Sequence, residues 1–224
     1  MTFSAAGGAG EVARLLATFQ RDLGVDARLV KLLSGDLRSE PWAQSRITLA
    51  AAVDEFVVSN HSSPTLLSLY RSRLSELDMK KIRQDSIIHL HWLPGVLSHE
   101  KVKHLLDQGR KVIWTLHDMA PFTGVCHHAH GCSGFIGDCV GCPQVRPLFR
   151  KAVELNLTVK LLNEPQPNLV VVAPTKWLAS QARTSSVFKH QRIEVIENPI
   201  RPDFFEAGKQ KREMSTKGSA RVGQ

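Results

Sequence analysis

This chain of 224 residues has few long apolar runs, few aromatic residues and no cysteine outside one short segment. No stretch approaches the roughly 20 uninterrupted apolar residues that a membrane-spanning helix needs. The N-terminal sequence MTFSAAGGAG lacks the basic start and the apolar core of a secretory signal peptide. These absences argue against an integral membrane protein and against a secreted one, and we expect a cytoplasmic protein.

Positive charge is in excess and is unevenly placed. The formal net charge is +8, and beyond Gly208 five basic residues accompany one acidic residue, which places +4 of that excess in the last residues. Segment 206–224 has almost no apolar residues, so we expect a disordered basic tail. The rest of the chain is mildly basic and carries no stripe of interleaved basic and aromatic residues. A nucleic-acid partner is therefore not expected.

Three apolar runs rich in β-branched residues predict buried strands. They are residues 86–92, 111–118 and 168–174, with weaker candidates at 26–33 and 192–198. Continuous rather than alternating apolar character suits strands covered on both faces, as in a parallel sheet. Segments with helical spacing lie between the runs. The pattern predicts an α/β fold, a Rossmann-like, doubly wound, mainly parallel sheet.

Capping residues support the predicted helices. Gly24 and Gly109 stand where left-handed C-terminal caps are expected, and Ser98 is a candidate N-cap. Residues 64–84 also have helical spacing, with basic residues outward between 71 and 83. That basic face is either solvated or in peripheral contact with anionic lipid at the inner face of the membrane.

A glycine-rich segment opens the chain's first predicted helix. Gly7, Gly8 and Gly10 would let backbone N–H groups approach a phosphate or a sugar hydroxyl at the helix N-terminus. A tight turn without a ligand is the alternative. Only six residues precede Gly7, so we expect the first strand to be short or missing.

Histidines follow two of the predicted strands. His89 and His91 share one face at the end of the first strong run, and Trp92 comes next. Ligands of open α/β sheets bind at the carboxyl ends of strands, so this group is a candidate sugar pocket. Hydrogen-bonded core histidines are the alternative.

The second strong run ends in His117 and Asp118. A histidine beside a carboxylate can act as an acid, a base or a hydrogen-bonding group toward a substrate hydroxyl. Phe122 and Thr123 are expected on the rim of the same site. The alternative is a structural pair that closes a loop.

All four cysteines fall within a short segment. Cys126, Cys132, Cys139 and Cys142 have the spacing C-x5-C-x6-C-x2-C, and the segment 123–143 has too little apolar content to order itself. Four sulfurs at this spacing are able to hold a structural zinc ion. Reduced thiols or a loop disulfide are the alternatives. His127, His128 and His130 are either substitute ligands or exposed loop residues.

Five blocks of sequence carry a family resemblance: HLHW, WTLHDMAPFTGVCHHAHGC, GDCVGCPQV, VAPTKWLA and IEVIENPI. In order and spacing they resemble the N-terminal domain of bacterial family 4 glycosyltransferases of the exopolysaccharide and colanic-acid type. The resemblance implies a GT-B fold, in which two Rossmann-like domains face a cleft. It also implies retaining transfer of a sugar from a nucleotide donor, with no metal needed for the transfer itself.

The resemblance further assigns roles along the chain. Residues 1–205 correspond to the acceptor-side domain, with the cysteine-rich loop as an insertion, and no donor-binding domain follows in this sequence. Gly7, Gly8 and Gly10 match the loop that faces the donor phosphates and acceptor. His117 matches the histidine against the transferred sugar. A UDP- or GDP-linked sugar is the expected donor, and a glycan or lipid-linked molecule the acceptor.

Two functions from different classes follow. One is the acceptor half of a polysaccharide-forming glycosyltransferase, inactive alone or completed by a separately encoded donor-binding half, because stabilisation of the departing diphosphate falls to that half. The other is a non-catalytic module that binds a glycan or acceptor without turnover.

Overall fold

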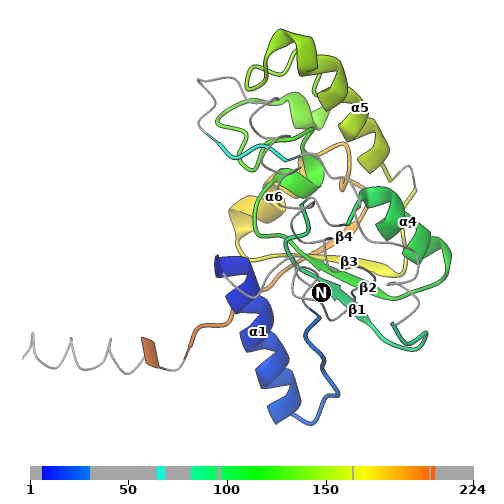
Figure 1. The fold of residues 1–224 in the computed structure, drawn as a ribbon, viewed down its shortest axis with the longest axis vertical. Coiled ribbons are helices and arrows are strands. Elements are labelled where there is room, and N and C mark those ends of the chain that lie inside the picture. The colour runs from blue at the N-terminus through cyan, green and yellow to red at the C-terminus, as the bar shows by residue number, and fades with distance from the viewer. Residues whose placement is uncertain are drawn as a thin grey trace, which may run out of the picture.

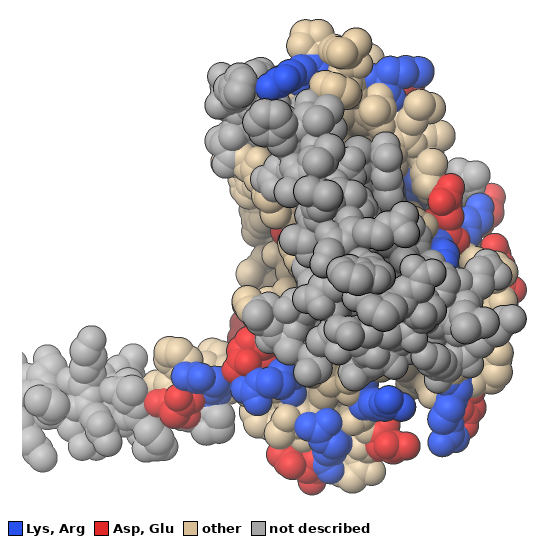
Figure 2. Space-filling model, viewed as in Figure 1, with Lys and Arg blue, Asp and Glu red and all other residues tan. Residues whose placement is uncertain are grey.

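The computed structural model describes residues 7–30, 65–68, 82–94, 97–162, 164–201 and 203–204. The expected basic tail, the residues before Gly7 and most of the expected helix at 64–84 lie outside these ranges. In the described part, basic and acidic side chains are interspersed on the face shown in Figure 2. Among the described residues, no helix combines the length and the apolar character needed to cross a bilayer.

A parallel sheet forms the centre of the described structure (Figure 1). Its strands are β1 (Ile88–Leu90), β2 (Val112–Thr115), β3 (Leu169–Ala173) and β4 (Arg192–Val195), in that spatial order. Leu90 pairs with Trp114, and Trp114 with Val171, so the three strongest predicted strands lie side by side in register. The predicted α/β class and parallel sheet are confirmed. The candidate strand at 26–33 is wrong for residues 26–30, which have no regular structure.

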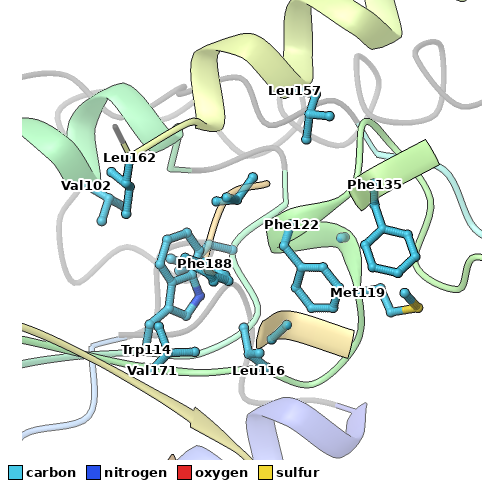
Figure 3. Close-up of a cluster of buried hydrophobic side chains, with 14 of the residues drawn as sticks. Val102, Trp114, Leu116, Met119, Phe122, Phe135, Leu157, Leu162, Val171 and Phe188 are labelled. Carbon is cyan, nitrogen blue, oxygen red and sulfur yellow. The ribbon is translucent and has the colours of Figure 1, made fainter. Parts of the chain in front are cut away.

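The two faces of the sheet differ in burial. Leu90, Trp114 and Val171 are at most 1% exposed, whereas the alternate residues His89, Ile113 and Val170 are only partly buried. The expectation of complete cover on both faces is therefore met on one face only. The covered face carries the apolar core in Figure 3, where the Phe188 ring meets Trp114 edge-on at 5.8 Å between centroids.

In the described part of the chain, the helices that accompany the strands are α1 (Gly7–Asp22), α4 (His99–Asp107), α5 (Arg150–Lys160) and α6 (Lys176–Thr184). Figure 1 shows α1 on the opposite side of the sheet from α4 and α5. The predicted caps are confirmed. Ser98 Oγ accepts a hydrogen bond from the Lys101 N–H, and Gly24 and Gly109 have φ of 81° and 74°. Ser98 thus begins α4, and the two glycines follow the ends of α1 and α4.

The cysteine-rich segment after β2 folds into short 3-10 turns: η1 (Ala120–Phe122), η2 (Gly134–Ile136) and, just beyond it, η3 (Pro147–Phe149). Val125, Ala129 and Phe135 from this segment belong to the main apolar core. The Phe135 ring meets Phe122 edge-on at 5.9 Å between centroids. The expectation that the segment has too little apolar content to order itself is therefore wrong, because these few residues reach the core of the sheet.

Gly124 tests how tightly this segment packs on α5. A Cβ at this position would overlap Val153 Cγ1 and lie 3.2 Å from Cys139 Cβ. We expect Gly124→Ala to lower the free energy of unfolding by about 1–3 kcal/mol, measured by urea denaturation. Gly8→Ala is the matched control, since nothing lies within 4 Å of its Cβ and alanine favours a helix. Equal unfolding midpoints for the two variants would contradict the packing.

Candidate active site

The expected histidines come together at the carboxyl ends of β1 and β2. His89 lies in β1 and its Nε2 is 2.8 Å from Thr115 Oγ1, the last residue of β2. His91 Nδ1 is 3.2 Å from His117 Nε2. The His89 and His91 ring centroids are 4.3 Å apart. Three imidazoles from two neighbouring strands thus lie together as predicted from their positions, with His91 hydrogen-bonded to His117 and the His89 ring packed against His91.

A large cavity opens beside this histidine group. It has a volume of about 850 Å³ and lies between α1 and the partly covered face of the sheet. Its walls include His89, His91 and Ile113 from the sheet side and Leu16 and Ala17 from α1. His89 and His91 therefore border a space large enough for a sugar or a larger ligand.

Burial keeps the three imidazoles neutral. It lowers the pKa of His89 to about 4 and that of His91 to about 2, with smaller contributions from neighbouring positive charge. Burial also lowers the pKa of His117 to about 4, against the opposing effect of the Asp118 charge. At neutral pH these rings are uncharged donors and acceptors. They suit hydrogen bonding to hydroxyl groups better than electrostatic attraction of phosphate.

Asp118 has a different set of partners from the one expected. Its Oδ2 accepts a hydrogen bond from Trp92 Nε1 at 2.8 Å and lies 2.6 Å from His127 Nδ1. Its Oδ1 accepts from the Ala120 N–H at 2.9 Å. Burial raises the pKa of Asp118, but these hydrogen bonds and the His127 charge outweigh it and hold the pKa below its ordinary value. The carboxylate thus fastens the loop after β2 to Trp92 and affects His117 through its charge.

His127 is a partner of Asp118 that the sequence analysis did not predict. It is only 9% exposed, and its Nε2 lies 2.8 Å from Ser68 Oγ. The expectation of an exposed loop residue is therefore wrong for His127, although it holds for His128 and His130. A bridge between Leu67 and Cys126 brings in the distant segment 65–68. No local sequence pattern predicts that pairing.

Phe122 and Thr123 are not on the rim of the site. Both are completely buried, with Phe122 between the rings of Phe135 and Phe188. Thr123 Oγ1 donates to the Cys126 carbonyl at 2.6 Å. The buried Lys160 ammonium donates to the Thr123 carbonyl. The prediction fails because the chain turns inward at η1 and takes these side chains into the core.

Lys160 stabilises the inward turn of the chain at η1. Its Nζ donates to the Ala120 and Thr123 carbonyls, each at 2.8 Å, from a side chain that is 1% exposed. Burial lowers its pKa to about 7, although the neighbouring thiols and Asp118 act in the opposite direction. The loop that carries Asp118 is therefore held both by the carboxylate and by a buried lysine.

The glycines lie inside α1 rather than in a turn before it. Gly7 is the first residue of the helix, with φ of 80°, and Gly10 is buried. A side chain on Gly7 or Gly8 would meet nothing within 4 Å, so space is available around both. Their predicted role in binding a phosphate or hydroxyl stays a prediction.

The cysteines form a separate cluster behind η1. All four are free thiols and line a small cavity of about 20 Å³. Burial raises the pKa of Cys126 to about 12 and that of Cys139 to about 11, so neither is an activated nucleophile. Within the described ranges, no group of three or more His, Cys, Asp or Glu side chains is placed so that it could hold a metal ion.

Taken together, the fold and the histidine group define a Rossmann-like domain with a polar site at its strand ends. The model of Glycosyltransferase Family 4 matches residues 6–204, and the chain belongs to this family. This confirms the family indicated by the sequence blocks. Family membership implies a nucleotide-sugar donor and an acceptor as the general substrates. No curated protein and no solved structure gives a significant match.

The neutral histidines predict a dependence of stability on pH. Unfolded histidine titrates near pH 6.5, whereas the folded pKa of His89 and of His117 is about 4. Between these values the unfolded chain binds more protons, so the free energy of unfolding falls as pH is lowered from about 6.5 to about 4. Urea denaturation at a series of pH values measures this slope.

Replacing one of these histidines isolates its contribution. We expect His89→Gln to reduce the slope by about 1.4 kcal/mol per pH unit, the value for one proton. His104→Gln is the matched control, because His104 is exposed on α4. An unchanged slope in the His89 variant would show that this ring is protonated in the folded chain.

Proposed function

We propose that this chain is the acceptor-side domain of a retaining GT-B glycosyltransferase. It takes part in moving a sugar from a UDP- or GDP-linked donor to a glycan or lipid-linked acceptor in polysaccharide synthesis. Family membership and the strand-end histidine group support the proposal. The observation that carries it is the position of His117, two residues after β2 and hydrogen-bonded to His91, which lines the large cavity.

The hydrogen bond to His91 determines what His117 offers a substrate. With both rings neutral, one nitrogen of the pair donates and the other accepts, which leaves Nδ1 of His117 for a ligand. Among the described residues no hydrogen bond to that atom is found. We propose that it binds a hydroxyl of the transferred sugar. A neutral ring orients that hydroxyl without competing for the phosphate charge of the donor.

In the transfer step itself, His117 does not need to act as a base. The bond from the anomeric carbon to the donor phosphate oxygen breaks, and the acceptor hydroxyl oxygen forms the new bond and passes its proton to the departing diphosphate. The diphosphate leaves with the negative charge, and its stabilisation belongs to the donor-binding domain of the proposed enzyme. His117 is thus a residue that touches the sugar and positions it.

The test is turnover of a polypeptide or complex that joins this chain to a donor-binding domain. We expect His117→Ala to lower kcat on the order of 100-fold, because a hydrogen bond that strengthens in the transition state is lost. Release of UDP or GDP from the corresponding nucleotide sugars measures the rate. His104→Ala, on the exposed face of α4, is the matched control. Wild-type turnover in the His117 variant would remove the assignment.

A further inference from the structure

The four cysteines converge on one point although they span a long loop. Cys126 follows the loop's start, Cys132 lies in its middle, and Cys139 and Cys142 lie near its end. All four line the same cavity of about 20 Å³. Such a volume holds about one water-sized occupant. This convergence is independent of the histidine group.

Gly134 marks how close two of the sulfurs are. A Cβ built on this glycine would lie 3.4 Å from Cys132 Sγ and 3.7 Å from Cys139 Sγ. Both sulfurs therefore lie close to the same point beside this glycine.

Backbone N–H groups already point at two of the sulfurs. The Gly134 N–H donates to Cys132 Sγ at 3.4 Å, and the Gly124 N–H donates to Cys139 Sγ at 3.3 Å. Hydrogen bonds of this kind orient and stabilise sulfur ligands around a metal. At both positions glycine also lets the backbone come close to the sulfur.

The ligand chemistry of the cluster suits zinc. Among the common divalent ions, zinc is the one that prefers a tetrahedral set of thiolate ligands.

We propose that Cys126, Cys132, Cys139 and Cys142 bind one structural zinc ion. Binding releases four protons as four thiols become thiolates, with no change of oxidation state. Zn–S bonds of about 2.3 Å require sulfurs about 3.8 Å apart. As they are placed in the structure, the thiols do not yet have this geometry, so zinc binding requires the four side chains to move together. With all four positions filled by sulfur, the ion has no open position for catalysis.

The zinc would act on the sugar site through the backbone. Cys126 precedes His127, whose ring is bound to Asp118. Fixing Cys126 therefore fixes His127, and through it the carboxylate that fastens the loop after β2. At the distal end of the loop, Ile136 and Val140 are exposed and do not pack into the apolar core. The ion would hold this end of the loop in place of such packing.

The experiment uses the full chain, produced with zinc in the medium and purified with reductant and without chelator. We expect one zinc per chain by elemental analysis. After chelation under denaturing conditions, alkylation without reductant should modify all four cysteines. Cobalt substitution should give the ligand-field bands of a tetrahedral site with thiolate charge transfer. Zinc well below one equivalent, or a disulfide in the freshly purified chain, would overturn the proposal.

Variants identify the ligands. Cys142→Ser should reduce the zinc content and shift the cobalt spectrum, whereas His130→Ala, an exposed histidine in the same loop, should change neither. Full zinc content with an unchanged cobalt spectrum in the cysteine variant would refute the ligand set. If that variant does not fold, wild-type metal content, thiol count and cobalt spectrum decide the proposal.

Discussion

The parallel pairing of β1 with β2 is the constraint on which the site depends. Because His89 pairs with Ile113 and Leu90 with Trp114, both strands end at the same edge of the sheet. The residues that follow them are then brought within hydrogen-bond reach although they are 26 positions apart in the chain. A shift of one residue in that register would turn Leu90 and Trp114 out of the core and separate the imidazoles. Core packing and site geometry are therefore maintained by the same pairing.

The polar network beyond the strands is built in two layers. His89 and His91, which line the cavity, and His117, which is hydrogen-bonded to His91, form the first layer, and their burial keeps them neutral. Asp118 and His127 form a layer behind it, which binds Trp92 and the segment 65–68 to the loop after β2. The second layer restricts the position of the first, as expected of a site that must present a ring at a fixed angle.

Strand-end chemistry was predictable from the sequence, and loop chemistry was not. The apolar runs fixed the positions of β1 and β2, and the alternation of side chains placed His89 and His91 together. Phe122 and Thr123 follow His117 closely, and proximity alone suggested the rim. Their burial depends on η1 turning inward over Lys160, a long-range contact without a local signal. His127 was misjudged for the same reason, since its partner Ser68 is distant in the chain.

The buried amine of Lys160 has a consequence for chemical labelling. Its nitrogen is enclosed by carbonyl groups, so acylating reagents can reach it only when the surrounding loop opens. A lowered pKa leaves much of the amine unprotonated near neutral pH, which makes it reactive once it is reached. The rate at which this one lysine is acylated therefore reports the opening frequency of the loop, without an introduced probe.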